Sequence, residues 1–548
     1  MNELYSLAVE PWLPVATRHG QRIFIPIRDI ARPDVLRIDT GRPDCDIAVT
    51  EFLIGLVAVG MGPSDGREWT RRYETPPSPE EIDAAIAPFA HALVLDGDGP
   101  RFFQDLDPLE NGAEEPVAAL FMDAPAGHFV KEGTVTALSR RAAAIALITL
   151  QTCAPTGGRG HFTSLRGGGA ASTLVIPRTG DETPSLWQVL WANVPDGYTI
   201  EADDADKVFP WLLETRSADR VGGTTPVDVH QAQAFFGMPR RIRLNFTEGN
   251  DERCALFGET DSIAVKSYLT RPNGAKYPTE TWRHPLSPYY QVKDKTSEVW
   301  LPLHFKGAAI DYRQWVGLTL RTKTSEVSLP ADIVSLFLNG RAKRIGLDSI
   351  TNHRAGIFAA GYAMDNMKPL DFTEAMLPLI SAGVPERDFD LAGCATAMIA
   401  GAEFGASLLL SALKEALWTA NKKGQPDNSK APLASARARF WGDTETTFYD
   451  TLRGLAAKAD DLGGRIYKEA KEAWLKTVRD AALAIFDDLA PIDSPESPDI
   501  KNIVNARKSL FFGLAGPAMF KALCLEAPER EKKDRKNGKA NGKGRKAA

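Results

Sequence analysis

Hydrophobic and polar positions follow two different rhythms along this chain. Up to about residue 370, short stretches alternate apolar and polar residues, a pattern typical of strands with one buried face. In the clearest of them, Ile242, Leu244 and Phe246 point to the same side. The predicted strands of this kind cover residues 22–27, 172–176 and 241–246.

Helical periodicity is interspersed among these strands. One predicted helix has a well-defined start, because Ser78 can cap it, Pro79 occupies its first position and Glu81 its third. The predicted helices cover residues 50–60, 79–93, 138–149 and 184–193. We therefore expect residues 1–370 to form one large, irregular N-terminal domain of mixed α/β structure.

The pattern changes after Asp371, where strand signals give way to segments rich in Ala, Leu, Lys and Glu. Four amphipathic segments follow, at residues 388–423, 431–458, 461–488 and 498–526. Long helices joined by short polar breaks predict a C-terminal four-helix bundle over residues 371–526. The fold class is therefore α+β. The last residues, 527–548, carry nine Lys/Arg and three Asp/Glu in a low-complexity stretch, which predicts a disordered basic tail.

Composition narrows the classes of protein that are possible. The five cysteines are scattered and form no CxxC pair, which argues against a disulfide framework and a cysteine-rich zinc site and favours the cytoplasm. We found no long apolar run and no secretory signal pattern, so we expect no membrane partner. The net charge is −6 although the tail is basic, so the body is acidic. Any contact with nucleic acid requires local basic patches within a larger assembly.

A glycine-rich stretch at residues 154–169 is the strongest candidate for binding. Gly157, Gly158 and Gly160 allow close backbone approach to a ligand, and Arg159 and Arg166 add cationic forks. This pattern fits a loop pressed against a phosphate backbone or a base edge, and it fits a mobile surface loop equally well. No Gly-Lys-Ser/Thr follows, so the stretch is not a nucleotide P-loop.

Two further polar turns stand out. Residues 269–276 form a Pro-Gly turn that carries Arg271, Asn273 and Lys276, and a second polar tip at residues 365–367 follows an apolar run. Each is either an ordinary surface turn or a contact element. We found no nucleophile, metal or phosphate-loop constellation, so we expect no enzymatic activity and no cofactor.

Eight short pieces, taken in order, resemble the CasA-type large subunit of the type I-E CRISPR surveillance complex, Cascade. Each piece is unspecific alone, but their order and spacing span nearly the whole chain. They lie at residues 12–15, 51–56, 102–104, 165–168, 235–239, 284–288, 361–362 and 436–441.

The resemblance implies a non-catalytic subunit that recognises the protospacer-adjacent motif (PAM) in double-stranded DNA. It would promote duplex opening and R-loop formation, and it would recruit the helicase–nuclease that degrades the target. Implied partners are the crRNA and the other Cascade subunits, namely the backbone, small and crRNA 5′-end-binding subunits. Some family members bind zinc through two CxxC pairs, which this chain lacks, so no zinc is expected.

The resemblance also assigns roles to individual residues. The DNA-binding residues would come from three elements: a glycine loop, a turn and a wedge. A fourth segment, at residues 127–133, would meet the crRNA and neighbouring subunits through Phe129 and Lys131. The implied DNA contacts are Gly157, Gly158, Arg159 and Gly160 in the loop, Arg271, Asn273 and Lys276 in the turn, and Asp365, Asn366 and Met367 in the wedge.

Two rival functions remain open from the sequence. The first is a nucleotide-binding enzyme that holds a phosphate in the glycine-rich loop at residues 156–169, with the bundle as a regulatory domain. The second is a scaffold subunit that makes no DNA contact. Nucleotide turnover by the purified chain would favour the enzyme, and a neighbouring CRISPR array would favour the surveillance complex.

Overall fold

The computed structural model divides into two compact units that the chain enters more than once. One unit comprises Met1–Thr396 and Glu445–Gly463, and the other comprises Ala397–Thr444 and Gly464–Ala548. The residues described are 4–122, 133–158, 160–178, 183–248, 252–293, 298–307, 309–322, 328–347, 355–365, 368–418, 430–458, 464–492 and 500–527.

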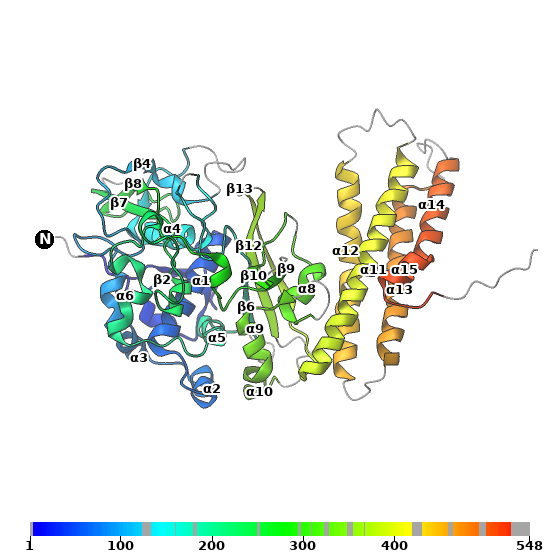
Figure 1. Ribbon diagram of the computed structural model, residues 1–548, viewed down its shortest axis with the longest axis horizontal. Coiled ribbons are helices and arrows are strands. Elements are labelled where there is room, and N and C mark those ends of the chain that lie inside the picture. Colours follow the sequence, from blue (N-terminus) through cyan, green and yellow to red (C-terminus); the bar gives the residue numbers. More distant parts are fainter. Residues whose placement is uncertain are drawn as a thin grey trace, which may run out of the picture. The chain divides into compact units, whose positions relative to one another are not determined.

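Helix α1 (Pro43–Met61) is the centre of the first unit (Figure 1). It is apolar on nearly every side and buried over almost its whole length, as expected of a helix surrounded by other elements. It packs against α4 (Arg140–Cys153) and α5 (Leu186–Ala192). These three helices confirm the predictions at residues 50–60, 138–149 and 184–193.

The other helices of this unit are short. Ser78 and Glu81 form the predicted capping box at the start of α3. The helix predicted over residues 79–93 is only partly α-helical. From Ala87 it continues as a 3-10 helix, whose second residue, Pro88, has no N–H to donate. The short helices are α2 (Gly66–Glu74), α3 (Pro79–Ile86), α6 (Ala205–Val208), α7 (Ala218–Val221), α8 (Tyr312–Thr319), α9 (Asp332–Leu336) and α10 (Ala342–Arg344).

Small sheets are distributed through the first unit. Their orders are β2-β1-β3, β10-β9-β11, β13-β12-β6 and β4-β8-β5, with β7 also paired to β8. The strands are β1 (Leu13–Thr17), β2 (Arg22–Ile25), β3 (Val35–Ile38), β4 (Ala113–Pro116), β5 (Leu138–Ser139), β6 (Ser172–Pro177), β7 (Arg241–Glu248), β8 (Ile263–Arg271), β9 (Tyr289–Lys293), β10 (Glu298–Pro302), β11 (Ser328–Leu329), β12 (Ala355–Asp365) and β13 (Lys368–Pro378).

The three predicted strands correspond to β2, β6 and β7. In β7, Ile242 and Leu244 are buried as predicted. Phe246 is only half-buried, because the register with β8 shifts between Asn245 and Phe246. A bulge of this kind turns the following side chain away from its expected face.

The longest strand pair is the antiparallel hairpin of β12 and β13, with β6 on the other side of β12. The pairing extends to Asp365 and Lys368 at the end of the hairpin. Strand β13 crosses the boundary that the sequence suggested between residues 370 and 371. The loss of an alternating pattern there reflects the weak burial of β13, in which Leu377 alone is fully buried.

Four long helices make up the C-terminal bundle (Figure 1). They converge at Gly405, where an added side chain would meet Val478, Leu514 and Phe440 from the three other helices. The fourth predicted segment is interrupted at Gly516, since Pro517 follows it and starts a new helix. The helices are α11 (Pro385–Leu417), α12 (Lys430–Ala457), α13 (Gly464–Leu489), α14 (Ile500–Leu514) and α15 (Pro517–Ala522).

Helix α11 differs from the sequence expectation in one respect. By length and composition alone it is the one helix in the described part of the chain that could cross a membrane. Within its apolar 18-residue window, 50% is buried inside the protein. Its backbone accepts a hydrogen bond at Met398 from the indole of Trp474, 2.8 Å away, as in a helix at the core of a bundle.

Candidate nucleic-acid interface

The glycine loop needs its glycines for conformational reasons. Gly158 and Gly160 have φ angles of 87° and 74°, a region that other residues rarely adopt. The loop is closed by two backbone hydrogen bonds, from Gly157 N–H to His161 O at 3.0 Å and from His161 N–H to Gly158 O at 3.1 Å. A Cβ atom added to Gly158 would meet no described atom within 4 Å. The tip of the loop is therefore open to a ligand.

The turn at residues 271–276 lies directly against this loop. Asn273 donates its backbone N–H to Gly160 O at 2.8 Å. A Cβ atom on Gly160 would lie only 2.5 Å from Asn273 Oδ1 and 2.8 Å from Pro272 Cβ. The structure therefore brings together two of the three elements that the sequence nominated. The variant Gly160→Asp would therefore displace the turn and is not a clean test of binding.

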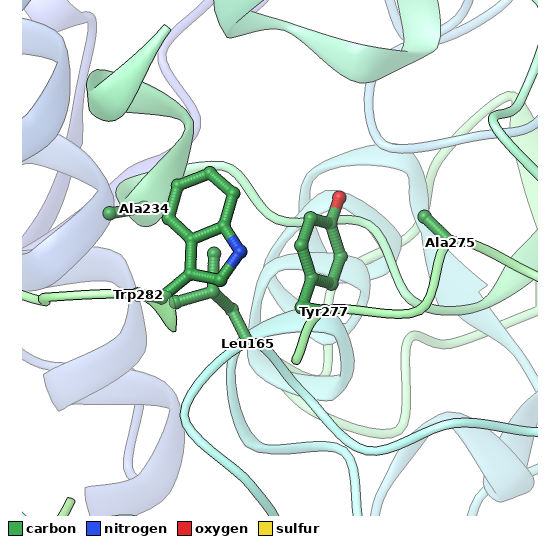
Figure 2. Close-up of a cluster of buried hydrophobic side chains, with 5 residues drawn as sticks. All are labelled: Leu165, Ala234, Ala275, Tyr277 and Trp282. Atoms are coloured by element: carbon green, nitrogen blue, oxygen red, sulfur yellow. The ribbon is translucent and has the colours of Figure 1, made fainter. Parts of the chain in front are cut away.

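A hydrophobic cluster fixes the loop and the turn beneath the surface (Figure 2). Leu165 comes from the glycine-rich stretch, and Ala275 and Tyr277 come from the end of the turn. The rings of Tyr277 and Trp282 meet edge to face with centroids 5.7 Å apart. Tyr277 also accepts a hydrogen bond from the Met238 backbone N–H at 3.0 Å. The two surface elements thus share one buried support.

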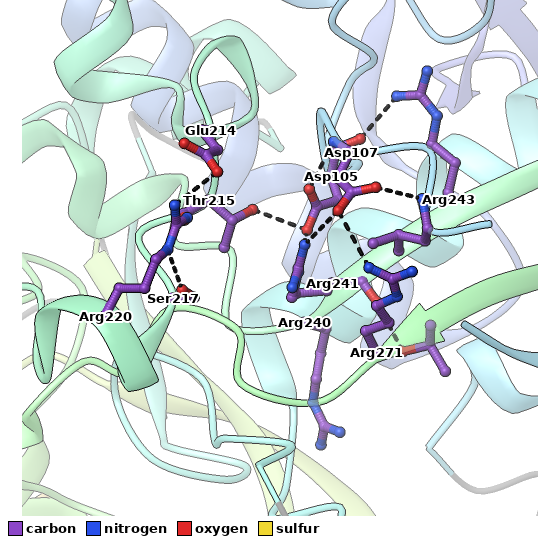
Figure 3. A network of polar contacts seen from close by, with 12 residues as sticks. Asp105, Asp107, Glu214, Thr215, Ser217, Arg220, Arg240, Arg241, Arg243 and Arg271 are labelled. Atoms are coloured by element: carbon purple, nitrogen blue, oxygen red, sulfur yellow. Dashed lines mark hydrogen bonds and ion pairs between the residues drawn. The ribbon is translucent and has the colours of Figure 1, made fainter. Parts of the chain in front are cut away.

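Arginines gather beside the turn (Figure 3). Arg241 Nε lies 2.6 Å from Asp105 Oδ2, and Arg271 Nη1 lies 3.4 Å from Asp107 Oδ2. Arg241 and Arg271 are opposite each other on β7 and β8, so Asp107 contacts both. The pKa of Asp107 is lowered by the Leu109 backbone N–H and by these two arginines. Because Asp105 and Asp107 pair with Arg241 and Arg271, this cluster does not by itself form the local basic patch that contact with nucleic acid requires.

The side chains of the turn differ in availability. Arg271 is half-buried and already paired with Asp107, so it is not a free cation. Lys276 is exposed, and its backbone carbonyl accepts a hydrogen bond from Thr224 N–H at 2.8 Å. Asn273 has a φ of 61°, which places it at the most sharply bent point of the turn. Lys276 and Asn273 are therefore the better placed contacts.

Arg166 does not have the role that the sequence suggested. Its side chain is 5% exposed and lies 2.6 Å from Glu51 Oε2 on α1. Its Nη1 donates to the hydroxyls of Ser172 at 2.9 Å and Ser287 at 3.0 Å. The prediction that this arginine faces a ligand is wrong, because a carboxylate distant in the sequence binds it inside the core.

The third nominated element adjoins the glycine-rich stretch through Gly169. A Cβ atom on Gly169 would lie 2.8 Å from Tyr362 Cβ and 3.1 Å from Met364 Cγ, both on β12. The strand ends at Asp365, whose side chain is exposed. The glycine-rich stretch therefore contacts the turn near one end and the β12–β13 hairpin near the other.

Some nominated residues lie outside the described part of the chain. This applies to one loop residue, two wedge residues and the two proposed crRNA contacts. Their roles stay predictions. The residues are Arg159, Asn366, Met367, Phe129 and Lys131.

The sequence interpretation missed Arg240, which lies under the glycine loop. Its Nη2 donates a hydrogen bond to Pro155 O. The signal was present as the basic run of Arg240, Arg241 and Arg243 at the start of β7. The alternation that follows it, with Ile242, Leu244 and Phe246 on one face, indicates a strand and gives no sign of the contact with Pro155.

Buried histidines predict how stability depends on pH. Burial, and then the charge of Arg166, lowers the pKa of His284 well below its usual value, and burial also lowers the pKa of His161. The unfolded chain takes up these protons near pH 6.5, whereas the folded chain does not. We therefore expect the free energy of unfolding to be unaffected by these two histidines above about pH 6.5 and to decrease as the pH falls below that value.

Burial raises the pKa of Asp46 to about 6, so this carboxyl stabilises the folded protein in acid and opposes the effect of the histidines. The variant His284→Asn therefore isolates the contribution of His284. Melting temperatures measured from pH 7.5 to 5.5 should fall more steeply for the wild type than for the variant. The difference corresponds to about 1.4 kcal/mol per pH unit at most. Parallel curves would show that His284 does not resist protonation.

Comparison with known proteins identifies the family. A family profile described as CRISPR-associated protein Cse1 matches residues 6–485. The chain belongs to the Cse1 family. Membership makes it a CRISPR-associated protein and supports its assignment as a type I-E large subunit.

Solved structures agree with the Cse1 fold. The Cse1 protein of Acidimicrobium ferrooxidans superposes with a TM-score of 0.64 at 20% identity, covering 96% of this chain and 100% of that one. CasA of Thermus thermophilus gives 0.66 at 18%, covering 93% and 99%. A chain of a structure described as a CRISPR RNA-guided surveillance complex gives 0.63 at 16%, covering 93% and 99%.

Four of the eight stretches that resemble the Cse1 family meet in the core around α1. Phe52 lies 6.1 Å from Trp12, 5.4 Å from Phe102 and 5.8 Å from Phe236, ring centroid to ring centroid. Edge-to-face contacts of this kind add to the stability gained from burial alone. The resemblance was therefore carried largely by residues that build the fold.

Proposed function

We propose that this Cse1 protein is the non-catalytic large subunit of a type I-E CRISPR surveillance complex that recognises the PAM in double-stranded DNA. The observation that carries the proposal is the hydrogen bond between Asn273 and Gly160. It joins the glycine loop and the turn into one surface with an open tip at Gly158. Lys276 is the exposed cation of the turn and can attract a DNA backbone.

The chemistry of this surface suits the minor groove of DNA. That groove is narrow and presents few distinguishing groups, so a backbone loop without side chains can enter where larger residues would clash. Lys276 and Asn273 then contact the groove edges or phosphates. Such a small set of contacts predicts permissive recognition, which leaves the sequence search to pairing with crRNA.

We propose that duplex opening involves the tip of the β12–β13 hairpin. Asp365 stands at that tip, next to Asn366 and Met367 in the sequence. An amide can hydrogen-bond a base edge and a thioether can cover an exposed base, which offsets lost stacking. Contact of Gly169 with β12 supports a common action of loop and hairpin.

The proposed partners follow from the same assignment. They are crRNA, double-stranded target DNA, the backbone, small and crRNA 5′-end-binding subunits, and the helicase–nuclease effector. Similarity to a chain of an RNA-guided surveillance complex supports the first of these. Phe129 and Lys131 stay the proposed contacts to crRNA and neighbouring subunits.

The rival interpretation as a nucleotide-binding enzyme is weakened by Arg166. Arg166 is a cation that the glycine-rich stretch offered for a phosphate, and it is instead committed to Glu51 in the core. We expect no ATP or GTP turnover by the purified chain. Turnover abolished by a single substitution in the loop would favour the enzyme instead.

The test is a pair of variants at Gly158, since the tip is open there and both Asp and Asn tolerate a positive φ. In the complex assembled with crRNA and its partner subunits, Gly158→Asp should weaken PAM-dependent DNA binding by about 1–3 kcal/mol. The added carboxylate repels phosphates, whereas Gly158→Asn has the same shape without the charge and should bind more tightly than the aspartate. Equal affinities for wild type and Gly158→Asp, at equal melting temperatures, would contradict the assignment.

A further inference from the structure

Arg240 is fixed directly beneath the glycine loop. The side chain of Gln151 makes two hydrogen bonds to its backbone. Gln151 Oε1 accepts one from Arg240 N–H at 3.0 Å, and Gln151 Nε2 donates one to Arg240 O at 3.0 Å. Its guanidinium reaches Pro155 O with Nη2. A Cβ atom on Gly157 would collide with Nη1, so the glycine leaves room for the cation at this place.

Unlike its neighbours, this arginine has no counter-ion among the described residues. Arg241 and Arg271 pair with Asp105 and Asp107, whereas Arg240 points away from both aspartates (Figure 3). Its Nε is buried and donates no hydrogen bond to any part of the chain that the structure describes. Burial lowers the pKa of Arg240 to about 10, and the group still carries its charge at neutral pH.

An enclosed cation without an anion is unfavourable, because desolvation is not offset by pairing. The arrangement becomes favourable when an anion supplies the missing acceptor. Phosphate is an anion that suits this side chain, since a guanidinium can offer two parallel N–H groups to it. At the neighbouring Gly158, an added Cβ atom would meet no described atom within 4 Å, so the loop is open at that residue.

We propose that Arg240, together with the backbone of Gly157 and Gly158, binds a backbone phosphate diester of the target duplex. The inference rests on the proposed function and adds to it a contact that fixes the position of the protein along the DNA. The loop backbone would read the groove while Arg240 holds one phosphate beside it. Contacts to phosphate fix position without reading sequence.

The test measures one phosphate at a time in the complex assembled with crRNA. Duplexes carry a neutral methylphosphonate at a single position, scanned across the PAM and its flanks. One position should weaken binding by the wild type and have no further effect on Arg240→Gln. Independently, Arg240→Gln should reduce the slope of log affinity against log salt by about 0.9, so a fourfold rise in salt changes the ratio of the two affinities by a factor of about 3.5.

Two further variants control for folding and for general charge. Arg240→Lys keeps the cation and should retain most of the salt slope even if it loses some affinity. Arg220→Gln removes a nearby arginine that is paired with Glu214, and it should respond to the methylphosphonate scan like the wild type. Inorganic phosphate added to the scan tests whether the site binds a free anion instead of the DNA backbone. If millimolar phosphate competes with DNA, and no single methylphosphonate position weakens binding, the site binds a free anion and the proposal is wrong.

The proposal is overturned if Arg240→Gln responds to every substituted phosphate as the wild type does. It is also overturned if this variant binds less well with an unchanged salt slope, which would mark Arg240 as a support for Pro155 alone. Either result leaves PAM preference intact. If the wild-type complex itself shows no PAM preference, that result would instead contradict the proposed function.

Discussion

Replacing Arg166 by methionine is expected to destabilise the protein by about 3–5 kcal/mol. The reason is that Glu51 would remain as an unpaired carboxylate in the core, where it is now 2.6 Å from the guanidinium. Ser172 and Ser287 would lose their charged partner as well. The expected result is a large fall in melting temperature, measured by calorimetry, or loss of soluble protein.

The double variant Glu51→Leu/Arg166→Met is the control. Removal of both charges leaves no unpaired ion, and a hydrophobic pair of similar volume is often as stable as a buried ion pair. We expect the double variant to recover most of the stability lost in Arg166→Met. If the single variant melts like the wild type, the ion pair is not the structural support that its burial indicates.

The second large effect concerns duplex opening. Replacement of residues 365–367 by alanines should slow R-loop formation strongly while weakening first contact with the PAM much less. The physical reason is that opening a base pair costs a few kcal/mol, and a tip that fills the gap offsets part of that cost. Rates of R-loop formation can be followed in the assembled complex with a base-analogue probe next to the PAM.

A duplex with mismatched bases beside the PAM provides the control for this variant. Its opening cost is already met, so the alanine variant should form R-loops on it nearly as fast as the wild type. Impairment of the same size on matched and mismatched targets would contradict a role in opening. It would indicate that the tip contacts a partner or supports the hairpin.

Local features of this fold were predictable from sequence. The capping box of Ser78 and Glu81 depends on residues three positions apart, and the structure contains it. The long helices of the bundle follow from periodicity that needs no knowledge of distant partners. The end of α3 shows the limit, since the predicted continuation is a 3-10 helix.

The candidate site was only partly predictable, because its decisive contacts link distant residues. Glycines at 158 and 160 were recognised for their freedom at positive φ, and the structure uses both. Nothing local indicates that Arg166 binds a carboxylate 115 positions away, so its role was assigned wrongly. The contact between Asn273 and Gly160 is equally non-local, and the resemblance to a family nominated both elements without joining them.

The hydrogen bond from Asn273 to Gly160 also bears on how PAM preference can change in evolution or in a selection experiment. With a Cβ atom excluded at Gly160 by Asn273 and Pro272, most single substitutions there are lost before recognition is tested. We expect epistasis: a new residue at 160 becomes viable when residues 272 and 273 change with it. Libraries that randomise both segments together should therefore yield altered specificities that libraries of the loop alone do not contain.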